Sequence, residues 1–103
     1  MTREFRESPV VQGVDEEIVY TLTTTEWGSS PSSASIKVFD VTSTPRTDVT
    51  STVMPSGSAS IAGDVITFPI LKSLVIGHVY RIEVKFNAVG NVFEAWGEVR
   101  AEE

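Results

Sequence analysis

The sequence predicts an all-β protein that folds as a two-layer β-sandwich. Short runs rich in β-branched and aromatic residues recur at intervals of about 8–12 residues, with Gly, Pro, Ser, Asn or Asp between them. Apolar and polar residues alternate within these runs, and no apolar period of about 3.6 residues persists over about ten residues, as a helix would require. We therefore expect about seven to eight short antiparallel strands.

The clearest strand signal lies in residues 70–86, ILKSLVIGHVYRIEVKF. Leu74, Gly77 and Tyr80 precede an alternating run, with a glycine that can turn the chain sharply and a tyrosine that can bury its ring. A buried tyrosine whose hydroxyl bonds to nearby backbone is typical of the tyrosine corner, so the pattern predicts an Ig-like Greek-key β-sandwich. One contiguous core should include Ile18, Tyr20, Leu22, Ile36, Val38, Ile66, Phe68, Ile82, Val84 and Phe86.

The first part of the chain predicts an arm, an edge strand and two longer strands. Residues 1–7 are polar and charged, which predicts a loose N-terminal arm or an edge piece that docks only through Phe5. Residues 8–12 suit a short edge strand, because Pro9 has no backbone N–H and an edge strand can do without that hydrogen-bond donor. Two further runs of alternating apolar residues, joined by a serine-rich loop, predict strands over residues 17–25 and 34–41.

Residues 48–54 predict a shorter strand or edge that Pro55 ends. Their central residues, Thr50 to Val53, carry no charge, whereas soluble proteins usually guard open edges with charge, proline or bulges. We therefore expect this edge, or a face that holds Trp96, to contact a second subunit or another protein.

The last part of the chain predicts two hairpins and a tail. Gly63, between Ala62 and Asp64, predicts a tight turn between strands at 58–61 and 65–70. The pair Gly90-Asn91 predicts a two-residue turn that leads into a final strand over 92–100. Residues 101–103 are expected to form a short, frayed acidic tail.

Composition restricts the possible functions. A chain of 103 residues predicts a single domain over residues 1–103. Its net charge of -6, with Lys and Arg together numbering 8, argues against nucleic-acid binding, which needs clustered basic residues. The absence of cysteine excludes disulfides, thiolate zinc sites and a cysteine nucleophile. No apolar run approaches the ~20 residues of a membrane span, and the N-terminus shows no signal-peptide pattern.

No residue pattern predicts catalysis or a metal site. His78 lacks the partners of a Ser-His-Asp arrangement, and metal binding by histidine needs further ligands. The carboxylates at residues 15–17 are typical of a solvated strand end, and no calcium-loop spacing occurs. The glycines form no nucleotide-binding loop. We expect a non-enzymatic protein without a cofactor.

Trp27 and Trp96 are the candidate binding residues, because an exposed tryptophan favours a sugar or a protein partner. Alternation places Trp96 outside the core if Phe93 lies inside it. We favour the alternative, in which a β-bulge near Gly97 turns Trp96 into the core. Trp27 is expected either to bind a ligand or to cap one end of the sandwich.

Six segments stand together along nearly the whole chain: EIVY at 17–20, WGSSP at 27–31, IKVFD at 36–40, DVT at 48–50, GDVI at 63–66 and LVIGHVYRIEV at 74–84. This ensemble resembles the short Ig-like β-sandwich proteins encoded among the structural genes of tailed bacteriophages and prophages. The resemblance implies a module that decorates heads, necks or tails, or that serves in packing or adhesion, without catalytic residues. It also implies a location in the virion or in the cytoplasm of the host cell.

We therefore predict a non-enzymatic structural or interaction module. The alternative is a small carbohydrate-binding β-sandwich that uses Trp96 or Trp27. The expected partners are another protein or a second copy of the chain, and a carbohydrate under the alternative. Neither a nucleic acid nor a membrane is expected.

Overall fold

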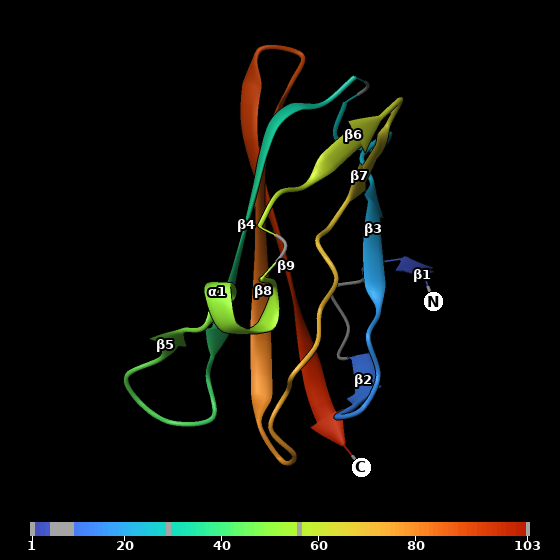
Figure 1. Cartoon of the computed structure of the whole chain (residues 1–103). Helices are drawn as coiled ribbons and strands as arrows, with labels where there is room; N and C mark the ends of the chain where they lie inside the picture. Colours follow the sequence, from blue (N-terminus) through green and yellow to red (C-terminus); the bar gives the residue numbers. More distant parts are fainter. Residues whose placement is uncertain (1, 5–9, 29, 56, 103) are drawn as a thin grey trace.

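The computed structural model describes residues 2–4, 10–28, 30–55 and 57–102. Two sheets pack face to face, with strand orders β1-β3-β7-β6 and β2-β9-β8-β4-β5. Figure 1 shows β4, β8 and β9 in one layer and β3, β6 and β7 in the other. The elements are β1 (Thr2–Glu4), β2 (Val10–Gly13), β3 (Val19–Thr23), β4 (Ser32–Asp40), β5 (Thr47–Asp48), α1 (Thr50–Val53), β6 (Ser60–Ala62), β7 (Val65–Thr67), β8 (Val79–Ala88) and β9 (Asn91–Glu102). The predicted all-β sandwich is confirmed.

The long hairpin of β8 and β9 forms the centre of the five-stranded sheet. Its antiparallel register runs without a break from the pair Val79–Arg100 to the pair Ala88–Asn91. The turn is Val89-Gly90, one residue earlier than predicted, and both residues have positive φ, at 45° and 80°. Positive φ at both central residues is typical of the type I′ turn, whose twist matches that of the two strands.

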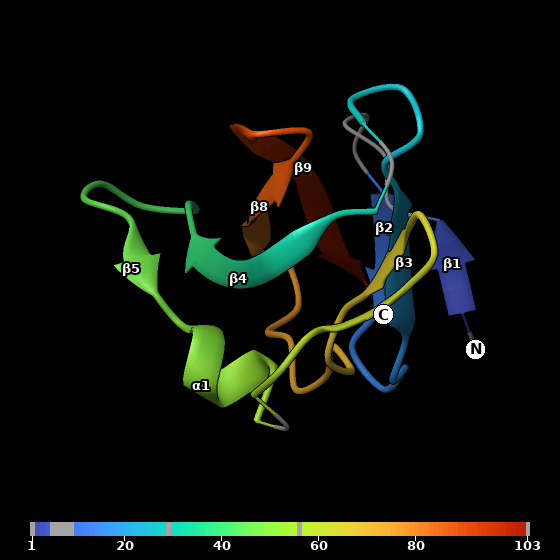
Figure 2. The ribbon, with the colours of Figure 1, turned by 90° about the horizontal axis from the view of Figure 1, so that it is seen from above.

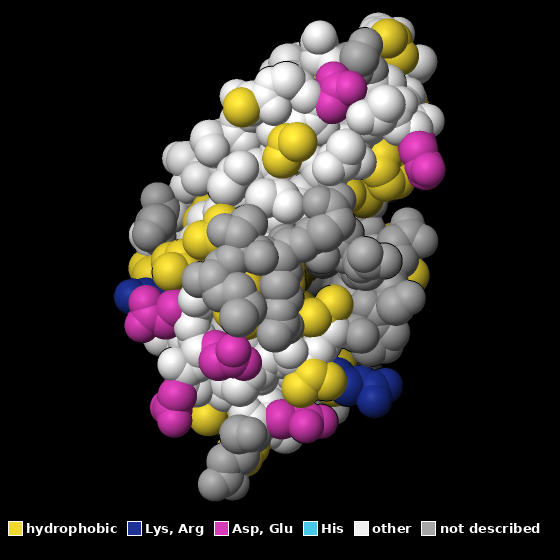
Figure 3. Space-filling view, turned by 90° about the vertical axis from the view of Figure 1, so that its right-hand side faces the viewer, with side chains coloured by type: hydrophobic (Ala, Val, Ile, Leu, Met, Phe, Trp, Pro, Cys, Tyr) yellow, Lys and Arg dark blue, Asp and Glu magenta, His cyan; other side chains and the backbone are white. Residues whose placement is uncertain are grey.

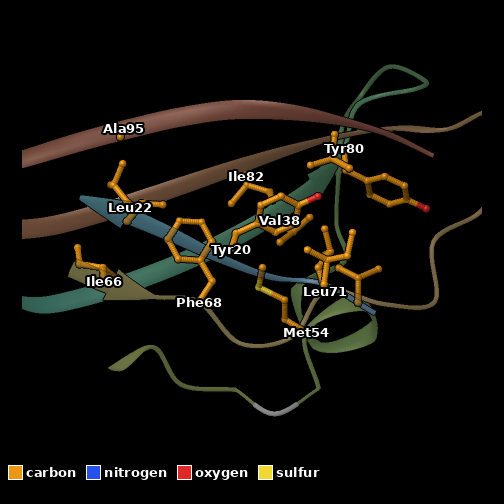
Figure 4. Close-up of a cluster of buried hydrophobic side chains, with 14 of the residues drawn as sticks. Tyr20, Leu22, Val38, Met54, Ile66, Phe68, Leu71, Tyr80, Ile82 and Ala95 are labelled. Carbon is orange, nitrogen blue, oxygen red and sulfur yellow. The ribbon is translucent and has the colours of Figure 1, made fainter. Parts of the chain in front are cut away.

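The core lies between the two sheets, as the alternation predicts. Every predicted core residue is buried except Ile36, which is partly buried and packs against the core. Side chains from both sheets meet there, as the labelled residues in Figure 4 show. Several residues outside the predicted set complete the core, among them Val53, Met54, Leu71, Leu74, Ala95, Val99 and Ala101.

The predicted tyrosine corner is present at the start of β8. The Tyr80 side chain is 2% exposed, and its hydroxyl oxygen accepts a hydrogen bond from the Val75 N–H at 2.8 Å. Gly77 takes a φ of 81°, a conformation that side chains other than glycine rarely adopt, and so lets the chain turn between them. Burial raises the pKa of the Tyr80 hydroxyl, with a further contribution from the charge of Asp40, despite the opposing hydrogen bond from Val75.

The predicted strand or edge over residues 48–54 is wrong. Only Thr47–Asp48 pairs as β5, and the helical turn α1 follows it on the open side of the sandwich (Figure 2). Asp48 Oδ1 accepts hydrogen bonds from the Thr50 N–H at 3.0 Å and the Thr50 hydroxyl at 2.7 Å, which favours a turn over an extended chain. Thr50 Oγ1 also accepts the Val38 N–H at 2.9 Å, so α1 covers part of the edge of β4.

In the described part of the chain, no helix is both long and apolar enough to cross a bilayer.

The two ends of the chain are more ordered than predicted. β1 pairs in parallel with β3, and β2 pairs in parallel with β9, so the sheets are not wholly antiparallel. The predicted loose arm is therefore wrong for residues 2–4, whereas Phe5 and Pro9 lie outside the described residues. The predicted frayed tail is wrong for residues 101–102, because they continue β9 beside β2.

A buried amide that the sequence did not predict connects the two sheets. Gln12 on β2 is fully buried. Its Nε2 donates to the Leu71 carbonyl at 2.9 Å and to the Glu16 carbonyl at 3.0 Å. Its Oε1 accepts the Tyr20 hydroxyl at 3.0 Å. Every polar atom of this side chain therefore has a partner, and β2 is held against β3 and the chain that follows β7.

We expect Tyr80→Phe to lower the free energy of unfolding by about 1 kcal/mol, the usual net contribution of one hydrogen bond. Burial raises the pKa of the Tyr80 hydroxyl in the folded state above its ordinary value of 10.0. The stabilisation that the neutral hydroxyl gives the fold is therefore complete below pH 10 and is lost as the pH rises above that value. Urea denaturation at neutral and alkaline pH measures both effects. Equal stability of wild type and variant at neutral pH would contradict the role of the corner.

We expect Val84→Ala to cost about 2–3 kcal/mol, because it opens a cavity in a packed core. Val84 is fully buried on β8. The matched control is Val92→Ala on β9, whose side chain is 60% exposed and which should change stability by less than about 0.5 kcal/mol. Similar midpoints for both variants in urea denaturation would show that the inward and outward faces are assigned wrongly.

Candidate binding surface on the five-stranded sheet

Trp96 lies on the outer face of the five-stranded sheet. It is opposite Glu83 of β8 in an unbroken register, and its side chain is 41% exposed. Phe93 is partly buried and stacks on Phe86, with ring centroids 5.7 Å apart. The expected β-bulge near Gly97 is therefore wrong, and simple alternation places Trp96 correctly.

A line of alternating aromatic and charged side chains crosses this face. The Arg81 guanidinium lies 4.1 Å from the centre of the Trp96 ring, and Arg81 Nε donates to Glu83 Oε2 at 2.8 Å. Arg46 Nη1 donates to the same oxygen at 3.1 Å, and its guanidinium lies 4.0 Å from the centre of the Phe39 ring. We call Phe39, Arg46, Arg81, Glu83 and Trp96 the Trp96 surface. Its cation–π and ionic contacts hold the rings in place.

A shallow hollow adjoins the Trp96 surface and shares Glu83 with it. Its volume is about 150 Å³. Lys85 lies opposite Ser35 on one side and Glu94 on the other in the strand registers. The hollow therefore offers donors and acceptors of both charges beside an aromatic ring. It is lined by Ser35, Lys37, Glu83, Val84, Lys85 and Glu94.

Trp27 does not belong to this surface. It is partly buried, and its ring meets the Phe86 ring edge-to-face, with centroids 6.0 Å apart and planes at 82°. The Trp27 and Gly28 N–H groups both donate to the Thr24 carbonyl, at 2.9 and 2.8 Å. A side chain at Gly28 would contact Val89 of the β8–β9 turn at 3.0 Å, so this loop packs against that turn. Trp27 thus caps one end of the sandwich, which was one of its two expected roles.

His78 is joined to Asp40 at the other end of β8. Its Nδ1 lies 2.7 Å from Asp40 Oδ2, and the two side chains are partly buried. Burial by itself would raise the pKa of Asp40, but hydrogen bonds from Thr42 and the contact with His78 lower it below its ordinary value. The pair fastens the end of β4 to the start of β8. Among the described residues, no group of His, Cys, Asp and Glu is placed to hold a metal ion.

The side of the molecule formed by the four-stranded sheet differs in its charged residues. Figure 3 shows the side of the four-stranded sheet, where acidic side chains are scattered and Lys and Arg are few among the coloured residues. Nucleic-acid binding depends on clustered basic side chains, and the visible residues of this face offer none.

The sequence identified Trp96 but not the residues around it. Phe39 and Arg46 are about forty residues from Arg81 and Glu83 in the chain, and Trp96 is further on still. The pairing of β4 with β8 places Phe39 opposite Arg81, and the pairing of β8 with β9 places Glu83 opposite Trp96. The available signal was the outward alternation of Arg81 and Glu83 in the central strand. Without a cross-strand register, that signal could not connect them with Trp96.

Comparisons with protein-family models, with curated proteins and with solved structures found no match to this chain.

The lowered pKa of Asp40 predicts a loss of stability in acid. A carboxylate with a depressed folded-state pKa stabilises the fold above its ordinary value of 3.8, and this contribution is lost as the pH falls below that value. Asp40→Asn should therefore be less stable than wild type at about pH 6, and the difference in stability should shrink as the pH falls below 3.8. Thermal unfolding over this range measures the difference. A constant gap between the two proteins at every pH would contradict the prediction.

Proposed function

We propose that this chain is a non-catalytic interaction module that binds a protein partner through the Trp96 surface. The observation that carries this proposal is the exposed Trp96 ring, held under Arg81 on the regular face of a sheet. Tryptophan and arginine are the residues that most often dominate binding energy at protein interfaces. The surface offers stacking and paired charges rather than a nucleophile and a base.

We also propose that the sandwich is an Ig-like Greek key. In immunoglobulin folds, strands A, B, E and D form one sheet, and C, F and G form the other, with additional strands beyond C in variable-type domains. The orders β1-β3-β7-β6 and β9-β8-β4-β5 support the same arrangement, with β2 added beside β9. The tyrosine corner at the start of β8, the counterpart of strand F, gives further support. The parallel pairing of β1 with β3 departs from an all-antiparallel ABED sheet.

The proposed setting is the particle of a tailed phage or prophage, or the cytoplasm of its host. The support is the resemblance of the six segments to short Ig-like proteins of such particles, together with the sandwich that these segments form. Genes for portal, capsid or tail proteins beside this gene would agree with the proposal. A neighbourhood without any virion gene would contradict it.

Selection of binders against the folded domain tests the protein-binding role. A displayed library of small protein scaffolds is selected on wild type, and each binder is then measured against Trp96→Ala and against Trp27→Phe as the matched control. Binders should lose at least about 30-fold in affinity with Trp96→Ala, as expected for a residue worth about 2 kcal/mol, and little with Trp27→Phe. Binders whose affinity is the same for wild type and Trp96→Ala, because they contact another surface, would contradict the proposal.

A carbohydrate is the second candidate ligand, favoured by the hollow beside Trp96. Sugars stack on aromatic rings and use neighbouring polar groups for their hydroxyls. Arg81 covers one face of the Trp96 ring, which leaves only the other face for stacking. Titration of Trp27→Phe with soluble oligosaccharides tests this, because Trp96 is then the sole tryptophan. A saturable change in its fluorescence would favour the sugar over the protein, and an unchanged signal would exclude the sugars tried.

A further inference from the structure

We propose that the hollow beside Trp96 holds a carboxylate side chain of the partner protein, bound by the ammonium groups of Lys37 and Lys85. This inference rests on the proposed function, because the hollow adjoins the Trp96 surface and shares Glu83 with it. It names the side chains that the partner must carry and the spacing between them.

A small residue among long ones creates the hollow. Ser35 and Lys37 follow one another on the outer face of β4, and Ser35 lies opposite Lys85 of β8. The short serine side chain leaves space beside the two long lysine side chains. The volume of about 150 Å³ is several times the roughly 30 Å³ that one water molecule takes up in the liquid. The hollow is therefore large enough for the carboxylate of an Asp or Glu side chain.

The two lysines that line the hollow are unpaired. Among the described residues, every ion pair leaves out both Lys37 and Lys85. Glu83 lies opposite Lys37 in the register of β4 with β8. Its Oε2 already accepts hydrogen bonds from Arg46 at 3.1 Å and from Arg81 at 2.8 Å. Both ammonium groups are therefore available to a ligand.

Two further carboxylates lie near these lysines without pairing with them. Hydrogen bonds from Thr50 are the main cause of the lowered pKa of Asp48, and the charge of Lys37 contributes less. Asp48 Oδ1 accepts both of those hydrogen bonds, at 3.0 and 2.7 Å. Glu94 lies opposite Lys85 and forms no ion pair with it. Glu94 is therefore the group that competes with a ligand for Lys85.

The charges around the hollow favour an anion. Within residues 30–55 and 57–102, four cationic side chains lie at the hollow or on the carboxylate that borders it, namely Lys37, Arg46, Arg81 and Lys85. They are half of the 8 Lys and Arg residues of the chain, and they outnumber Glu83 and Glu94, the carboxylates that line the hollow. A cation is therefore disfavoured. The net charge of -6 repels a polyanion such as a nucleic acid, so a single carboxylate on a protein fits best.

The position of the hollow relative to Trp96 sets the spacing of the partner's residues. Trp96 lies opposite Glu83, and Lys85 is the next outward residue along β8, so Trp96 and Lys85 are diagonal neighbours. Diagonal neighbours on adjacent strands are about 7–8 Å apart. Residues two positions apart in an extended chain are about 6.6 Å apart. An extended segment with an apolar residue on Trp96 therefore brings an acidic residue two positions away to the hollow.

The probe is the capped peptide Thr-Leu-Thr-Glu-Thr, titrated into the domain labelled with ¹³C and ¹⁵N. The NMR signals of the Trp96 indole N–H and of the ε-methylene groups of Lys37 and Lys85 should shift along one saturation curve. The same peptide with glutamine in place of glutamate keeps the shape and loses the charge. It should bind at least about threefold more weakly, because its two ion pairs with the lysines are lost. This comparison uses the wild-type protein and so does not depend on the folding of a variant.

Substitutions of single charges test which groups hold the carboxylate. Lys37→Gln and Lys85→Gln should each weaken peptide binding by about threefold, the effect of one exposed ion pair. Lys72→Gln is the matched control, because it removes the same charge outside the hollow and should change the affinity little. Glu94→Gln should strengthen binding by up to about threefold, because it removes the competing carboxylate. Lys37 and Lys85 are exposed, so urea denaturation should show that both variants are as stable as wild type.

The outcomes distinguish this inference from the proposed function. A peptide that shifts the Trp96 signal alone, or that binds equally well with glutamine, overturns the carboxylate site and leaves the Trp96 surface as the binding site. An equal loss with Lys72→Gln also overturns it, because net charge would then explain the effect.

Two further results would overturn the carboxylate site. One is the absence of any shift at millimolar peptide. The other is a soluble oligosaccharide of uronic acids that shifts the Trp96 and lysine signals when the peptide does not, which would assign the hollow to a sugar. The proposed function fails separately, if the selected binders have the same affinity for wild type and Trp96→Ala.

Discussion

The unbroken register between β8 and β9 is the constraint on which the rest of the structure depends. A strand has a side-chain period of two, so a slip of one residue would exchange its buried and exposed faces. In the observed register, Tyr80 and Val84 point into the core while Arg81, Glu83 and Trp96 point outward. The tyrosine corner, the core and the candidate binding surface are therefore consequences of a single pairing.

Local alternation predicted the parts of the fold that depend on one strand at a time. The core face of β8, the corner at Tyr80 and the turn at Gly63 follow from side-chain period and glycine geometry, and they were predicted correctly. Residues 48–54 have strand-forming side chains. The hydrogen bonds that Thr50 donates to Asp48, and the one that its hydroxyl oxygen accepts from the N–H of Val38 on a distant strand, favour α1 instead. The burial of Gln12 also could not be predicted from one strand, because its hydrogen-bond partners, Leu71 and Tyr20, belong to other segments of the chain.

The candidate site shows the same limit more clearly. The alternation of apolar and polar residues in the last strand placed Trp96 on the outer face. The expected β-bulge near Gly97 was wrong. It had been favoured because tryptophan is large and usually mostly buried. The energetic reason for its exposure is the Arg81 guanidinium, which covers one side of the ring while its own charge is balanced by Glu83. That compensation requires three residues on two paired strands, and a single strand cannot reveal it.

The same contacts bear on how tightly a partner could bind. Association loses free energy when mobile side chains become ordered, so a ring already held in place costs less to bind than a free one. Trp96 is held by Arg81, Arg81 by Glu83, and Glu83 also by Arg46, at distances of 4.1, 2.8 and 3.1 Å. Exposed ion pairs of this kind add little to stability, about 0–1 kcal/mol each. Their larger effect is on the geometry of the surface, because they keep the aromatic rings and both arginines in one fixed arrangement before a partner arrives.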